Sequence, residues 1–324
     1  MCTAATYLTE DFYFGRTLDY EFSYVDEVTI TPRNYPFSFR NAGTMSSHYA
    51  IIGIAYVLDN YPLYYDGVNE KGLCIAGLNF PDNAVYREEM KNMYNVAQFE
   101  FIPWILGQCS TIEEVKKLLV KTNITKTQFK DNLPVAQLHW LVADKNSSIT
   151  VEPGKDGIKF YDNPVGILTN NPPFNEQMVY LNNFMSLSVK PPLNNFSSKL
   201  DLHPYCRGMG AIGLPGDLSS PSRFVRAAFT KMNSVCNGSD SESIGQFFHI
   251  LGSVSQQRGC CETECGEYEY TIYTSCCNAD KGIYYYTTYY NHQISGINLY
   301  HENLDDNMPI RYSMIDKEQI MMQN

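Results

Sequence analysis

The 324-residue sequence predicts an α+β fold in which strands and helices form separate layers. Strand-like segments fill the first third of the chain, helical segments follow, and strand-like segments return near the end. A regular alternation of strand and helix, which would predict a parallel sheet, is not found. Hydrophobic residues make up 44% of the chain and no repeat or linker divides it, so we expect one domain over residues 1–324.

Short segments rich in Tyr, Phe, Ile and Thr predict the strands. Four of them lie in the first third of the chain, at residues 4–8, 12–18, 27–31 and 49–57. Segments 138–143 and 149–152 flank a polar stretch and therefore predict a hairpin with a longer loop. Near the end of the chain, segments 283–290 and 293–299 predict another strand pair.

Three segments have the apolar spacing that is typical of amphipathic helices. The first begins at Ser110, where the sequence Ser-Thr-Ile-Glu has the form of a capping box. The second begins near Ser222, which is placed to cap it. The three apolar faces are expected to contain Ile112, Val115, Leu118 and Leu119; then Phe224, Val225, Ala228, Phe229 and Met232; then Ile244, Phe247, Phe248 and Leu251.

Residues 190–221 form an irregular stretch that contains many Pro, Gly and Asn residues. Loops of this length within a compact domain usually have a function or contact a partner. A mobile surface excursion is the alternative, and the sequence leaves both open.

Charge and composition exclude several functional classes. The chain has 24 Lys and Arg residues against 35 Asp and Glu residues, a formal net charge of −11. Non-specific nucleic-acid binding needs a basic surface, so we do not expect it. The N-terminus has neither a basic nor an apolar stretch, which argues against a secretory signal. No segment reaches the roughly 18 apolar residues that a membrane helix needs, so we expect a cytoplasmic protein without membrane insertion.

Ten cysteines are many for a cytoplasmic protein, and five of them lie between Cys260 and Cys277. Disulfides would need an oxidising compartment, and a zinc site would need regularly spaced ligand pairs that this cluster lacks. We therefore expect reduced, mostly buried thiols and no metal site. The alternative is a binding or structural module in which the cluster holds a metal or disulfides.

Position 2 offers a candidate nucleophile. Removal of Met1, which a small residue such as Cys2 permits, would leave a thiol and a free α-amine on one residue. In model peptides the amine titrates at about 7.7–8.0 and the thiol at about 8.5, so the amine can act as a base near neutral pH. A nucleophile and a base on one residue need no separate histidine.

Arg16 and Asp19 follow closely at the end of the second strand-like segment. A guanidinium near the sulfur favours the thiolate, and a carboxylate near the amine fixes its orientation. The ordinary alternatives are a chance cysteine at position 2 and a surface ion pair. A Cys–His dyad would be the rival scheme, but none of the six histidines lies in a recognisable motif, and His139 and His249 fall in apolar runs typical of core or edge positions.

Motifs spread over the whole chain extend this interpretation. They are Met1-Cys2-Thr3, Gly15-Arg16 to Asp19, Asp66-Gly67-Val68-Asn69-Glu70-Lys71-Gly72-Leu73, Ala76-Gly77-Leu78-Asn79-Phe80-Pro81, Leu168-Thr169-Asn170-Asn171-Pro172, and Leu214-Pro215-Gly216-Asp217 with Ser222-Arg223-Phe224. Together they resemble the choloylglycine hydrolase family, which contains bile salt hydrolases and penicillin V acylases. The resemblance implies an N-terminal-nucleophile hydrolase fold, an αββα sandwich of two mainly antiparallel sheets between helical layers.

The resemblance also implies the roles of six catalytic residues. Cys2 would be the nucleophile, Arg16 would lie by its thiol, and Asp19 would hold its amine. Asn79 and a backbone N–H would form the oxyanion hole. Asn170, chosen over Asn171 from its register with Thr169 and Pro172, would anchor the amine or the substrate, and Arg223 would complete the polar network. No metal or organic cofactor is implied.

Asn79 indicates a bile salt hydrolase, because penicillin V acylases often carry Tyr at this position of the family. The expected substrates are bile salts conjugated to glycine or taurine, with penicillin V as the alternative. The family implies a homotetramer, with 190–221 as a possible contact. A rigid steroid needs an apolar cleft. By family position its walls would be Leu18, Tyr24, Leu58, Tyr65, Phe129, Leu133 and Leu138.

Overall fold

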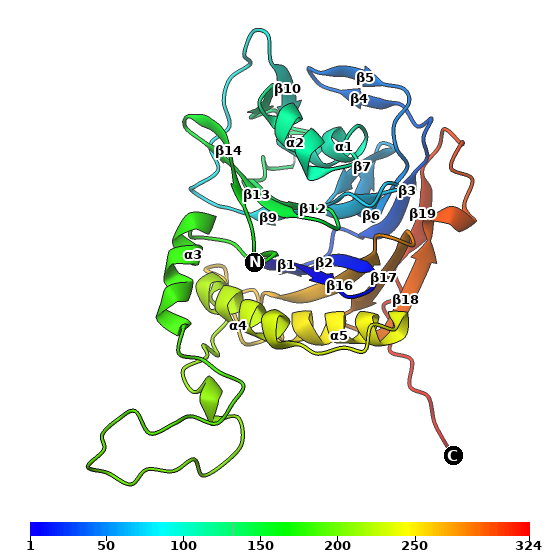
Figure 1. Ribbon diagram of the computed structural model, residues 1–324. Coiled ribbons are helices and arrows are strands. Elements are labelled where there is room, and N and C mark those ends of the chain that lie inside the picture. The colour runs from blue at the N-terminus through cyan, green and yellow to red at the C-terminus, as the bar shows by residue number, and fades with distance from the viewer. Residues whose placement is uncertain (132) are drawn as a thin grey trace.

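The computed structural model describes residues 1–131 and 133–324. Two antiparallel sheets lie face to face, and helices cover the outer surface of each sheet (Figure 1). The α+β prediction and the expected αββα layering are therefore confirmed.

The first sheet has six strands and contains the N-terminal strand of the chain. Its strands, in spatial order, are β15 (Ile167–Leu168), β1 (Cys2–Leu8), β2 (Phe12–Tyr20), β16 (Tyr270–Asn278), β17 (Ile283–Thr288) and β18 (Asn291–Asn298). All neighbours in it are antiparallel. At Gly15 an added Cβ would lie 2.0 Å from the carbonyl oxygen of Ser275. Only glycine therefore lets β2 and β16 approach this closely beside Arg16.

The second sheet is larger and lies opposite the first. Its order is β14 (Gly157–Asp162), β13 (Ser148–Gly154), β12 (Leu138–Ala143), β9 (Cys74–Asn79), β8 (Asp66–Asn69), β6 (Ile51–Leu58), β3 (Glu27–Thr31) and β19 (Ile310–Ser313), with β7 (Tyr61–Tyr64) paired to β6. Two small ribbons accompany it, β4 (Phe37–Phe39) with β5 (Gly43–Met45) and, in parallel, β10 (Tyr94–Ala97) with β11 (Thr122–Thr125).

Five α-helices form the outer layers of the described chain. Figure 1 places α4 (Ser220–Asn233) and α5 (Asp240–Gly252) across the first sheet, with α3 (Phe174–Leu181) beside them. The helices α1 (Phe101–Leu106) and α2 (Ile112–Leu119) cover the second sheet. None of the described helices is both long and apolar enough to span a membrane.

Alternation along the strands of the second sheet separates two hydrophobic clusters. On β6, Ile52 and Ile54 pack in the cluster that joins the two sheets, whereas Ile51 and Ala55 pack under α1 and α2. Successive side chains of a strand point to opposite faces, so a sheet buried on both faces reads as a continuous apolar run.

Most predicted elements form where the sequence indicated them, but two helix starts differ. Thr111 caps α2 by accepting a bond from the Glu114 N–H, one residue later than the box expected at Ser110. Ser219 is at the N-cap of α4, and the hydroxyl of Ser222 instead donates to Asp217. Residues 190–221 are irregular up to the start of α4, apart from one 3-10 turn, and Figure 1 shows this excursion projecting from the body.

Candidate active site

Strand pairing places Cys2 at a buried start of β1. Its register partner is Leu18 on β2, and its side chain and backbone are only 3% exposed. The pairing continues one residue further, because Asp19 N donates to Met1 O at 3.0 Å and the Met1 amine donates to Asp19 O at 2.7 Å. Because β1 and β2 form a local antiparallel pair, Cys2, Arg16 and Asp19 are brought together as expected from the sequence.

Arg223 joins helix α4 to the first strand. This buried guanidinium donates from Nη1 to Cys2 O and to Thr3 Oγ1, both at 2.6 Å. Its Nη2 donates to Asn170 Oδ1 at 2.8 Å, and the Asp19 carboxylate lies 3.9 Å from Nη1. Burial lowers the pKa of Arg223 from its ordinary value, and the facing Asp19 carboxylate opposes that effect. The residue therefore fixes the backbone of the candidate nucleophile and neutralises a buried acid.

Asn170 contacts the backbone nitrogen of Cys2, and Asn171 does not. The Cys2 N–H donates to Asn170 Oδ1 at 2.8 Å, and Asn170 Nδ2 donates to Asn79 O at 2.7 Å. The side chain of Asn171 instead donates to Pro81 O and accepts from Asn83. Of the two neighbouring asparagines, it is therefore Asn170 that contacts the Cys2 nitrogen.

Asp19 is held by groups that the sequence did not indicate. Its Oδ1 accepts from Thr271 Oγ1 at 2.6 Å, and its Oδ2 accepts from Thr17 Oγ1 at 3.1 Å and from Gln256 Nε2 at 3.4 Å. These donors come from β16, β2 and the segment after α5, so hydrogen bonds from three segments restrain the carboxylate. No local pattern links residues 256 and 271 to position 19, which is why they were missed.

Arg16 lies between the two sheets and reaches the cavity. It donates from Nε to Thr17 O and from Nη1 to Tyr65 O, both at 3.2 Å, and also to Gly77 O. Its buried Nη2 has no hydrogen-bond partner among the described residues. A buried N–H without a partner is costly, so this donor is available to an anionic or carbonyl group in the cavity.

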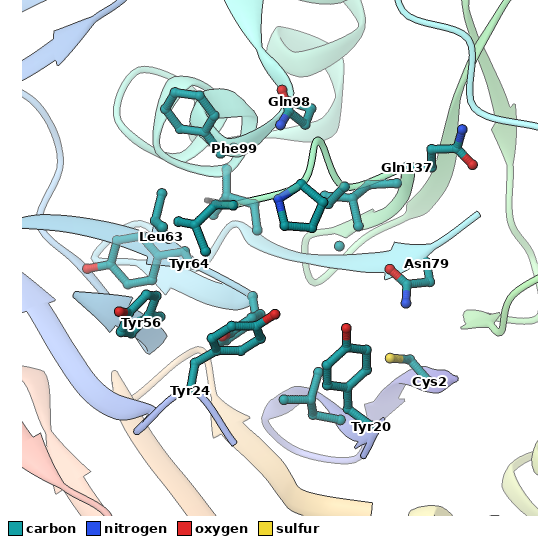
Figure 2. Close-up of a pocket in the computed structure, with 18 of the residues that line it drawn as sticks. Cys2, Tyr20, Tyr24, Tyr56, Leu63, Tyr64, Asn79, Gln98, Phe99 and Gln137 are labelled. Atoms are coloured by element: carbon teal, nitrogen blue, oxygen red, sulfur yellow. The ribbon is translucent and has the colours of Figure 1, made fainter. Parts of the chain in front are cut away.

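A cavity of about 470 Å³ opens in front of Cys2. Figure 2 shows Asn79 and Tyr20 at the same end of it as Cys2, and the apolar body of the cavity extends away from them. Arg16 and Asp19 also line it, whereas Arg223 and Asn170 support Cys2 from behind. Of the expected wall residues, those present are Leu18, Tyr24, Tyr65, Phe129, Leu133 and Leu138.

Leu58 is the exception among the expected wall residues. It is the last residue of β6, paired with Tyr61, and it is not among the described residues that line the cavity. Tyr56, on the same face of the strand, lines the cavity instead. Because a strand rises by about 3.3 Å per residue, Leu58 is carried about 7 Å beyond Tyr56 and past the cavity wall.

Aromatic residues make up much of the wall, and Tyr20, Phe22 and Tyr56 among them were not predicted. Tyr20 ends β2, and Phe22 and the predicted Tyr24 follow at every second residue, with ring centroids 5.2 Å apart for the first pair and 4.8 Å for the second. Tyr56 continues the row at 5.6 Å from Tyr24. Leu18, Tyr20, Phe22 and Tyr24 are two residues apart, and in a strand this spacing places side chains on one face. The spacing could therefore have predicted that these four side chains line the cavity together. Further lining residues are Leu63, Tyr64, Gln98, Phe99 and Gln137.

The described part of the chain shows neither a Cys–His dyad at Cys2 nor a metal or disulfide cluster. His139 is buried, stacks on Phe80 with ring centroids 4.2 Å apart, and is hydrogen-bonded to Thr169 O. No hydrogen bond joins it to the Cys2 thiol among the described residues. All ten cysteines are free, and no group of three potential metal ligands forms among the described residues. The expectation of mostly buried thiols was wrong for Cys206, Cys260 and Cys265, which are exposed, and for Cys236 and Cys261, which are partly exposed. Cys260, Cys261 and Cys265 lie in or directly before a surface hairpin, which explains their exposure.

The comparisons with known proteins agree over nearly the whole chain. The profile of the linear amide C-N hydrolases, choloylglycine hydrolase family, matches residues 2–312. A bile salt hydrolase/transferase from Lactiplantibacillus plantarum is 56% identical over 319 residues, covering 98% of both chains. A bile salt hydrolase/transferase from Clostridium perfringens is 38% identical and covers 95% of both.

Solved structures show the same architecture. A mutant of the conjugated bile acid hydrolase from Clostridium perfringens superposes with a TM-score of 0.93 at 36% identity, over 100% of both chains. Penicillin V acylase from Agrobacterium tumefaciens shares the fold, with a TM-score of 0.77 at 19% identity over 96% of this chain and 91% of its own. The family match, the long alignments and the fold lead to one conclusion: this chain belongs to the choloylglycine hydrolase family of linear amide C–N hydrolases.

Proposed function

We propose that this protein is a bile salt hydrolase, which cleaves the amide bond between a steroid acid and glycine or taurine. The observation that carries the proposal is Cys2, buried at the start of β1 and facing an aromatic-walled cavity of about 470 Å³. A largely apolar pocket with a few convergent polar groups fits a rigid steroid with one reactive amide. The names of the two relatives above, at 56% and 38% identity, support the same substrate class.

The proposed reaction begins with attack of the Cys2 sulfur on the amide carbonyl carbon. The thiol proton passes to the Cys2 α-amine, and the Arg16 guanidinium stabilises the thiolate. The Asn79 side chain and a backbone N–H stabilise the tetrahedral oxyanion, an interaction that contributes about 3 kcal/mol in comparable sites. The oxyanion collapses, the C–N bond breaks, and the leaving amine takes the proton from the ammonium. Water then cleaves the thioester and frees the steroid acid and the thiol.

This scheme requires removal of Met1. While Met1 is attached, the Cys2 nitrogen is an amide that donates to Asn170, and an amide nitrogen does not accept the thiol proton. The chain that begins at Met1 already has the pairing of β1 with β2 and the bonds of Arg223. It therefore has the geometry of the site without its base.

A side-by-side assay tests the proposed substrate. Glycocholate, taurocholate and penicillin V are incubated with protein whose intact mass shows loss of Met1, and release of the amine is measured. We expect both bile salts to be cleaved faster than penicillin V. Faster cleavage of penicillin V would instead assign the sister activity, and no cleavage of any of the three would contradict the proposal.

We further propose that residues 1–324 form one catalytic domain that assembles into a homo-oligomer, a tetramer as the family resemblance implies. The excursion at 190–221 and the turn before it support this, because they expose large apolar side chains that include Met185, Val189, Leu193, Phe196, Leu200, Leu202, Tyr205 and Ile212. Apolar side chains gathered on one projecting segment indicate an interaction surface. The free state of all ten cysteines supports a cytoplasmic location.

Replacing Leu193 and Phe196 together by Ser is expected to shift the protein to a smaller species, because both side chains are more than four-fifths exposed in the single chain. Light scattering coupled to size exclusion measures the mass. Val235→Ser, at an equally exposed position on another surface, is the control and should leave the mass unchanged. A double variant with the wild-type mass would contradict the assigned contact.

A further inference from the structure

Glu269 places a buried carboxylate at the start of the chain. The residue precedes β16 and is only 8% exposed, yet no position-specific pattern in the sequence singled it out. Its carboxylate forms an ion pair with the Met1 ammonium. Its own N–H donates to Cys261 O at 2.9 Å, which anchors it to the hairpin formed by residues 261–269. A buried acid held in this way has a function or a structural partner.

The pairing of the strands, rather than Glu269, determines where the Met1 nitrogen lies. Met1 exchanges two backbone hydrogen bonds with Asp19, at 3.0 and 2.7 Å, as a regular antiparallel pair does. The Met1 and Cys2 nitrogens are three bonds apart, which standard backbone dimensions limit to roughly 3.7 Å. When Met1 is lost, the new chain-start nitrogen is therefore still within a few ångströms of the Glu269 carboxylate, and that carboxylate has lost its cation.

We propose that Glu269 is a positioning residue for the Cys2 amine, and that its charge sets the pH at which this amine becomes a free base. The inference rests on the proposed function, because only an N-terminal cysteine uses its amine in this way. Glu269 touches neither the substrate cavity nor the sulfur in the described structure, so it acts through the amine.

Several charged groups face the amine and Glu269, and their balance decides the direction of the effect. Asp19 from β2 and Arg223 from α4 act on Glu269 directly. The Cys261 thiol of the hairpin lies beside Glu269 and the chain-start amine, and Glu21, which follows β2, acts on that thiol. Arg16 of β2 acts on the Cys2 thiol and on Asp19. Burial raises the pKa of Glu269, while the chain-start ammonium and Arg223 oppose that rise. The two arginines stay charged throughout and favour the neutral amine, whereas the Glu269 carboxylate favours the ammonium.

The sign of the expected change follows. An opposite charge within about 4–6 Å raises the pKa of an amine by one or more pH units, so neutralising Glu269 lowers it. The amine is the proposed base and acts only when deprotonated. The acidic limb of the pH profile of kcat/KM, which reports the free enzyme, therefore moves to lower pH.

The test uses Glu269→Gln in a chain released from a leader by cleavage immediately before Cys2, so that Met1 processing plays no part. Intact mass confirms the first residue, and kcat/KM for glycocholate is measured from acid to neutral pH. We expect the acidic limb to move down by about one pH unit. Glu267→Gln, on the exposed side of the same hairpin, is the matched control and should keep the wild-type limb.

Glu269→Asp withdraws the carboxylate by one methylene and should shift the limb in the same direction by less. It also keeps the inference testable if the Gln variant does not fold. A limb at the wild-type position in an active Glu269→Gln or Glu269→Asp enzyme would overturn the inference, as would an equal shift in Glu267→Gln. If the wild-type protein itself fails to cleave glycocholate, the proposed function fails rather than the role of Glu269.

Discussion

Cys2→Ala is expected to lower kcat/KM for glycocholate and taurocholate by about 10⁴-fold or more, which is the scale for removal of a covalent nucleophile. The substitution removes one sulfur atom from a residue that is only 3% exposed. The backbone bonds that Cys2 makes to Arg223 and Asn170 remain. The variant should therefore fold and bind bile salt, but it has no atom that can form the thioester.

Cys109→Ala is the matched control. Cys109 is also free and buried, but it packs in the cluster under α1 and α2 and is not among the residues lining the cavity. It should keep turnover within a few-fold of the wild-type rate. Amine release measures both variants, and circular dichroism checks their folding. Substantial hydrolysis by a folded Cys2→Ala enzyme would remove the covalent mechanism, whatever the family membership of the chain.

Arg223→Met is expected to lower the free energy of unfolding by about 3–5 kcal/mol, because it removes one partner from a buried charge pair. Met fills a similar volume, so the cost arises from polar groups rather than from a cavity. The Asp19 carboxylate would lose its facing cation, and Cys2 O, Thr3 Oγ1 and Asn170 Oδ1 would each lose a donor.

Urea unfolding followed by tryptophan fluorescence measures this loss. Arg207→Met, in the exposed excursion, removes the same charge where water screens it, and it should change stability by less than about 0.5 kcal/mol. A similarly small effect of Arg223→Met would show that Asp19 and the Cys2 carbonyl do not depend on the guanidinium.

Local geometry and the family resemblance predicted different parts of the site. Cys2, Arg16 and Asp19 meet because β1 and β2 form one antiparallel pair, in which Cys2 lies opposite Leu18. Asn170 and Arg223 come from distant segments, and only the family resemblance indicated them. Glu269 carries no motif and reaches the chain start from the residue before β16, so neither local pattern nor resemblance found it.

The errors have similarly specific causes. Ser110 and Thr111 are both good capping residues, so the start of α2 was uncertain by one residue until the bond from Glu114 N to Thr111 fixed it. Leu58 was placed in the wall by family position, but in this chain the cavity wall along β6 ends at Tyr56. The exposure of Cys260 and Cys265 depends on a surface hairpin that residue type alone does not predict.

The central claim is that the Cys2 nitrogen must be a free amine, and two preparations of one chain test it most directly. One is cut from its leader before Cys2 and the other before Met1, and intact mass verifies each. We predict that glycocholate is hydrolysed only by the chain that begins with Cys2, and that treating the other with a methionine aminopeptidase raises its rate in proportion to the Met1 removed. Equal hydrolysis by a chain that verifiably keeps Met1 would contradict the account.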